Sequence, residues 1–176
     1  SKMIGEFDNP HRITLSPIWE LPFGKGRRFS TDSAALNRVI GGWQISAIYI
    51  YQTGAAVWLS SVLHTGLSPK LDSPAIDKWF NLDSMKILPP FTARRNPYMW
   101  NDLRTATQNN WDIAILKKTA LRPERLSLQF RAEFINAFNH PWFGSPNVNP
   151  AAASYGQVLS QANSPREIQL AMKLSF

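Results

Sequence analysis

Five stretches of this chain alternate between apolar and polar residues, and this pattern limits the fold more than any other feature of the sequence. A period of two places successive side chains on opposite faces of a β-strand, whereas a helix needs a period near 3.6. The alternating stretches lie near residues 11–21, 43–53, 111–117, 125–138 and 166–176. The sequence therefore predicts an all-β, antiparallel fold in which one face of each strand avoids water.

The last stretch, PREIQLAMKLSF, shows the pattern most clearly. Its apolar face carries Ile168, Leu170, Met172, Leu174 and Phe176, and polar residues separate most of them. In the stretch at 125–138, apolar residues at 126, 128, 130 and 134 also fit one side of a helix. Strict alternation and the terminating sequence NHPWFG favour a strand there. Pro17 interrupts the first stretch, which indicates an edge or a bulge at that point.

The connections between the predicted strands differ in length. KTALRPER is short, and FGKGRRFSTDSAALNRVIGG is intermediate, with one helical turn predicted between a cap at Asp32 or Ser33 and a stop at Gly41. Residues 60–110 and 139–164 form long connections without a sustained period. Short turns on one side and long loops on the other are typical of outer-membrane barrels, and strands of about 9–12 residues match a tilted membrane-crossing strand.

Two folds hide one face of each strand from water, and alternation alone does not separate them. The first is a transmembrane β-barrel segment, which the aromatic residues near the strand ends favour because such rings prefer the membrane interface. The second is a soluble or surface-attached β-sheet module whose apolar face meets a core. In that alternative, aromatic side chains in the long loops bind a carbohydrate-like ligand.

Composition argues against several other functions. The chain has no cysteine, which excludes thiolate metal sites and cysteine nucleophiles. None of the histidines His11, His64 and His140 lies at metal-ligand spacing, and no phosphate-binding loop or G-x-S-x-G elbow occurs. The net charge is +7, but basic residues do not interleave with aromatic residues as in nucleic-acid platforms. We therefore expect no enzyme, no cofactor, no metal and no nucleic-acid partner.

Several stretches of the sequence resemble one family of membrane proteins. LQFRAEFINAFNHPWFGSPN, NNWDIAILKK and SPREIQLAMKLSF are similar to the last strands of large TonB-dependent outer-membrane receptors, of the Oar-like type common in Acidobacteria. The stretches HRITLSPIWELPFGKGRRF and VIGGWQISAIYIYQTGAAVWL resemble the two strands before them. The resemblance covers almost the whole chain and is weakest between residues 62 and 107.

The resemblance implies a 22-stranded barrel with a plug inside it, in the outer membrane of a Gram-negative bacterium. Residues 1–176 are then expected to form the C-terminal part of the barrel, with about five strands and with the plug and the other strands elsewhere. The implied partners are outer-membrane lipid, the remainder of the barrel and plug, the TonB complex and the barrel-assembly machinery. That machinery is expected to read the last strand through Phe176, Leu174, Met172 and Leu170.

Within this interpretation, two further groups of residues are candidates for function. The polar faces of the last strands are expected to line the lumen, because a charge facing lipid costs about 2–4 kcal/mol near the midplane. The residues of this group are Gln129, Arg131, Glu133 and Gln169. Aromatic residues in the long loops either contact the solute or form small loop cores. The candidates are Trp79, Tyr98, Trp100 and Trp142.

Overall fold

The computed structural model describes residues 5, 8–94, 96–122 and 126–176. Over these residues the chain forms two compact units. The sheet unit contains Ile13–Ile50, Asn109–His140 and Ser164–Phe176. The loop unit contains Tyr51–Gln108, Pro141–Asn163 and the described part of Ser1–Arg12. The long connections predicted from the sequence therefore fold mainly into a unit of their own.

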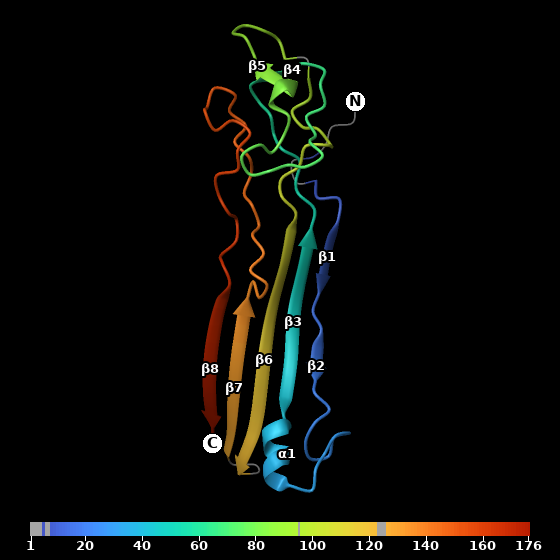
Figure 1. Ribbon diagram of the computed structural model, residues 1–176, viewed down its shortest axis with the longest axis vertical. Coiled ribbons are helices and arrows are strands. Elements are labelled where there is room, and N and C mark those ends of the chain that lie inside the picture. Colours follow the sequence, from blue (N-terminus) through green and yellow to red (C-terminus); the bar gives the residue numbers. More distant parts are fainter. Residues whose placement is uncertain (1–4, 6–7, 95, 123–125) are drawn as a thin grey trace. The chain divides into compact units, whose positions relative to one another are not determined.

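One six-stranded sheet carries the alternating stretches (Figure 1). Its strands are β1 (Arg12–Leu15), β2 (Ile18–Glu20), β3 (Trp43–Gln52), β6 (Gln108–Arg122), β7 (Leu126–Ile135) and β8 (Glu167–Ser175). Their order is β1-β3-β6-β7-β8, and β2 also pairs with β3. The interruption predicted at Pro17 is confirmed, because β1 ends at Leu15 and β2 begins at Ile18.

The strand register keeps apolar side chains on one face of the sheet. Between β7 and β8, Phe130 lies opposite Met172 and Ala132 lies opposite Leu170. On the other face, Glu133 lies opposite Gln169. The antiparallel pairing of β6 with β7 continues both faces, since Ile115 pairs with Ala132 and Ala114 pairs with Glu133. A shift by one residue would mix the two faces, so this register preserves the pattern seen in the sequence.

The strand bounds differ from the predicted ones at two places. The third stretch, predicted at 111–117, is the longer strand Gln108–Arg122. The sequence placed its last residues in a short connection, but in the structure they pair with β7. The pairing is regular as far as Ala120, and the register shifts between Ala120 and Arg122. The fourth stretch ends at Ile135 rather than 138, because Asn136 takes a left-handed backbone conformation with φ 49°. Its predicted start at residue 125 lies outside the described residues.

The helical turn predicted between β2 and β3 is confirmed as α1 (Ala34–Ile40). Ser33 caps it by accepting a hydrogen bond from the Leu36 backbone N–H, and Gly41 ends it. Gly42 follows at φ 75°, and a Cβ there would lie 2.1 Å from the Lys118 carbonyl oxygen. Only glycine therefore lets the chain leave the helix and enter β3 beside β6. No helix among the described residues is long and apolar enough to cross a membrane.

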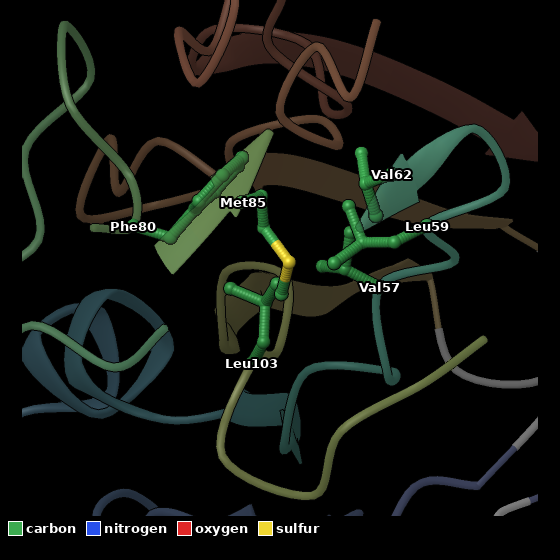
Figure 2. Packing of buried hydrophobic residues seen from close by; sticks show 6 residues of the cluster. All are labelled: Val57, Leu59, Val62, Phe80, Met85 and Leu103. Atoms are coloured by element: carbon green, nitrogen blue, oxygen red, sulfur yellow. The ribbon is translucent and has the colours of Figure 1, made fainter. Parts of the chain in front are cut away.

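The loop unit has its own hydrophobic core (Figure 2). A short antiparallel pair, β4 (Val62–His64) with β5 (Met85–Ile87), and the 3-10 helix η1 (Leu82–Ser84) supply part of it. Figure 2 shows the buried side chains gathered around Met85; they are Val57, Leu59, Val62, Phe80, Met85 and Leu103. The long connection over residues 60–110 contains only these short elements before β6 among its described residues, yet its hydrophobic side chains, which have no regular spacing in the sequence, meet in a common core.

Candidate functional site

The apolar face of the sheet unit is open to its surroundings. On β8 the exposed fractions are 57% for Ile168, 68% for Leu170, 71% for Met172 and 52% for Leu174. Phe176, which follows β8, is fully exposed. A row of exposed apolar side chains along a strand marks a surface that meets another apolar phase or partner.

Aromatic side chains flank this apolar face at both ends of the strands. At one end, the rings of Tyr49 and Trp111 stack with centroids 4.5 Å apart, and Phe138 meets Trp111 edge-on at 6.2 Å. At the other end lies Trp43, six residues before Tyr49 on β3. Six residues of strand span about 20 Å. Two aromatic levels at this separation resemble the girdles that border the apolar band of a membrane barrel.

The opposite face of the sheet is polar and carries the predicted lumen residues. Arg131 donates a hydrogen bond to Glu133, with Nη2 and Oε1 2.5 Å apart. Both lie along one side of β7, where Gln129 pairs in register with Lys173 of β8. The structure thus brings Gln129, Arg131, Glu133 and Gln169 together on one face, and the charged pair is satisfied within β7 itself.

Comparison with known families decides what kind of surface this is. Residues 3–169 match the family model described as Outer membrane beta barrel domain. The chain belongs to this outer-membrane β-barrel family. No curated protein and no solved structure matches the chain. Membership places the protein in the outer membrane and favours the barrel over the soluble module.

In an outer-membrane barrel the apolar face of the wall meets lipid, and we expect the same of the apolar face of this sheet. The lumen assignment of the opposite face stays a prediction. In the described part of the chain, the sheet does not close on itself, since β1 and β8 lie at its two ends. Unpaired strand edges cost several kcal/mol per unsatisfied group in lipid. We therefore expect both edges to pair with further strands.

The sequence NAFNHP, residues 136–141, which carries part of the family resemblance, forms a hydrogen-bonded corner where β7 ends. Asn136 is 3% exposed and its backbone N–H donates to the Asp112 carboxylate at 2.9 Å. Its side chain accepts from the His140 N–H and donates to the carbonyls of His140 and Ser164. The backbone N–H of Arg166, just before β8, donates to the side chain of Asn139. The corner therefore joins β6, β7 and the approach to β8.

Replacing Asn136 with alanine should destabilise the barrel wall. The change removes three side-chain hydrogen bonds at a buried site, and alanine tolerates φ 49° less well than asparagine. We expect a loss of about 1–3 kcal/mol. The free energy of unfolding is measured by urea titration, with heat-modifiable migration on gels as the readout of the folded fraction. Asn109→Ala, at an exposed position, is the matched control, and an equal loss there would contradict the role of the corner.

Three of the four candidate loop aromatics pack within the loop unit. Trp79 and Trp100 lie against the hydrophobic core. The indole Nε1 of Trp79 donates to the Arg104 carbonyl at 2.7 Å, and that of Trp142 donates to the Ala106 carbonyl at 3.3 Å. These contacts occupy the indole N–H groups of Trp79 and Trp142, and packing against the core holds Trp100. All three side chains therefore support the loop fold, and their assignment as solute contacts stays a prediction.

Tyr98, the fourth candidate, belongs to an exposed stack. Its ring lies 4.6 Å from that of Trp58 at an interplanar angle of 19°, and the Arg94 guanidinium lies 3.8 Å from the Tyr98 ring centroid. The backbone carbonyls of Leu59, Ser60 and Pro97 accept hydrogen bonds from that guanidinium. Desolvation lowers the pKa of Arg94, although guanidinium remains charged at neutral pH. These hydrogen bonds hold the Arg94 guanidinium against one side of the stack.

Sequence reasoning did not select Trp58, although a local signal exists. Val57 and Leu59 are 4% and 0% exposed, whereas Trp58 between them is 48% exposed. The alternation that identified the long strands therefore also holds over these three residues. A large aromatic side chain that points away from a core while its neighbours point inward is a candidate for binding.

A groove also opens on the loop unit near Arg104. Its volume is about 540 Å³, and its lining includes the rings of Trp79 and Phe143 and the charged side chains of Lys70, Asp72 and Asp102. Arg104 is pinned in its wall by Asp8, whose carboxylate lies 2.7 Å away. Nearby in this unit, burial raises the pKa of the Tyr155 hydroxyl to about 12. Among the described residues, no three histidine, aspartate or glutamate side chains gather closely enough to hold a metal.

Proposed function

We propose that this chain forms barrel wall and outer loops of a TonB-dependent receptor that imports a solute across the outer membrane. One observation carries the proposal: the long connections of the wall fold into a unit with its own buried core. A barrel that serves only as a wall or an open pore has no need for such a unit. The resemblance of residues 128–147 to Oar-like receptors supports the same conclusion.

In this function, the loop unit captures the solute outside the cell. The exposed Trp58–Tyr98 stack offers a flat apolar surface, and the groove beside Arg104 offers charges of both signs. A surface of this kind suits a solute with an apolar ring or sugar face and polar substituents. In this role the chain acts as a binder and conduit, with no covalent step.

The remaining steps use parts of the receptor outside the described sheet. Further strands pair with the edges at β1 and β8, and a plug fills the lumen against the polar face that carries Arg131 and Glu133. Energy from the inner membrane reaches the plug through the TonB complex. The exposed apolar side of β8, with Leu170, Met172 and Leu174, is the part we assign to the barrel-assembly machinery, with Phe176 next to it.

Transport measurements test the proposal. Cells that lack the gene should lose uptake of a solute, and cells that lack TonB should lose uptake of the same solute. In liposomes, the assembled protein should give no passive swelling with small sugars, because a plug closes it. Swelling in liposomes together with uptake that survives loss of TonB would identify an open pore instead. A double variant, Trp58→Ala with Tyr98→Ala, should weaken uptake while leaving assembly unchanged.

A further inference from the structure

We propose that α1 is a membrane-interface helix, whose exposed side chains Leu36 and Val39 insert among the phospholipids of the inner leaflet. The sequence alone predicted only one helical turn at this place. The inference goes beyond the transport function and does not depend on it, because it rests on the sheet unit alone. It concerns how the wall is fastened to the membrane rather than what passes through it.

The first observation is the side of the sheet on which α1 ends. Lys117 of β6 shares the apolar face with Ile113 and Ile115, and it pairs with Phe130 of β7. Its ammonium donates to the last carbonyls of the helix, at 3.0 Å to Arg38, 2.7 Å to Val39 and 2.8 Å to Gly41. The C-terminal end of α1 therefore lies over the lipid-facing surface, not over the lumen.

The second observation is that Lys117 is satisfied by protein groups alone. An ammonium has three N–H donors, and three backbone carbonyls accept from them. These carbonyls form the negative end of the helix dipole, and the ammonium lies 4.7 Å from the Trp43 ring centroid. A lysine on a lipid-facing surface is costly in the bilayer, and this arrangement lowers that cost without water.

The third observation is the exposed face of the helix itself. Leu36 and Val39 are one turn apart on one side of α1, and they are 46% and 63% exposed. The indole N–H of Trp43 donates to the Val39 carbonyl at 3.0 Å, which holds this apolar side next to the aromatic level of the wall. The opposite side of the helix carries Ala34 and Arg38. Such a helix fits a membrane interface.

Phospholipid is the occupant that the surroundings favour over a protein partner. The helix continues a surface that already meets lipid, through Trp43 and Lys117. The turn that precedes it adds an exposed pair of rings, Phe23 and Phe29, 5.5 Å apart. Basic side chains accompany these rings: Lys25, Arg28 and Arg38. Apolar side chains mixed with basic ones match a leaflet that contains anionic headgroups.

Spin labels test the position of α1 directly, and the chain offers a clean background because it contains no cysteine. Single variants Leu36→Cys, Val39→Cys and Ala34→Cys are labelled with a nitroxide in the protein assembled in outer-membrane vesicles. Collisions with oxygen, which concentrates in lipid, are compared with collisions with a water-soluble nickel chelate. We expect a several-fold higher ratio of oxygen to nickel collisions at Leu36 and Val39 than at Ala34.

The outcomes separate the occupants. Equal ratios at all three positions, with high nickel accessibility, would overturn the proposal, because all three side chains of α1 would then lie in water. Low accessibility to both reagents at Leu36 and Val39 would also overturn it, because a protein surface then covers the helix. If one labelled variant fails to assemble, the other position gives the same comparison with Ala34. Lys117→Gln should lower the ratio at Val39 by freeing the end of the helix.

Discussion

Replacing Leu170 with arginine will sharply reduce the amount of protein assembled in the outer membrane. Leu170 lies near the middle of β8 on the apolar face, opposite Ala132 of β7, and its side chain is 68% exposed. An arginine facing lipid near the midplane of a barrel costs about 2–4 kcal/mol. A loss of that size removes much of the stability of a typical protein. The assembled fraction is measured by heat-modifiable migration and by protease protection in outer-membrane fractions.

The neighbouring position supplies the matched control. Gln169→Arg introduces the same side chain one residue earlier, on the opposite face, where it meets Glu133 in register. We expect normal assembly of this variant because the new charge faces a carboxylate. If Gln169→Arg and Leu170→Arg lower assembly equally, the assignment of the two faces is wrong, and with it the lumen positions of Gln129, Arg131 and Glu133.

Replacing Phe80 with alanine will unfold the loop unit and leave the barrel wall assembled. Phe80 is fully buried in the core of that unit, and its ring meets the edge of Tyr155 at 5.3 Å. Truncation of a buried phenylalanine costs about 3–5 kcal/mol. Hydrogen exchange should rise across residues 56–105 and stay unchanged in β6, β7 and β8. If the loop unit captures the solute as we propose, solute uptake should also fall in this variant.

Phe91→Ala is the control for the loop unit. Phe91 belongs to the same connection, but its side chain is fully exposed, so truncation creates no cavity. We expect unchanged hydrogen exchange in the core and normal assembly. Loss of wall assembly in Phe80→Ala would show that the two units fold together, and would contradict an independent core.

The sequence predicted the wall because the wall obeys one local rule. Alternation fixes which side chains share a face, and residues such as Leu170 and Gln169 fall on the faces that the pattern assigned. The helix α1 was readable for the same reason, since Ser33 and Gly41 are local signals at its ends. The end of β7 was not, because the left-handed conformation of Asn136 depends on hydrogen bonds to residues far along the chain.

The loop unit was not predictable from local patterns. Its core brings Val57 and Phe80 together with Leu103, residues far apart in the sequence that share no period. The roles of Trp79, Trp100 and Trp142 follow from that packing, and their residue type alone pointed equally to a ligand. Lys117 is a similar case. Alternation in the sequence places it on an apolar face, but the helix end that accepts its hydrogen bonds lies in another part of the chain and could not be predicted from local pattern.

The buried core of the loop unit has a consequence for how outer-membrane barrels of this kind diversify. The six buried side chains of that core all belong to the loop unit, so we expect the unit to keep its fold without help from the membrane-crossing strands. If the loop unit binds the solute as we propose, selection for a new solute acts on surface positions such as Trp58, while selection for membrane insertion acts on the strands. These two selective pressures act on separate sets of residues, so the binding surface can change while the membrane-crossing strands stay the same.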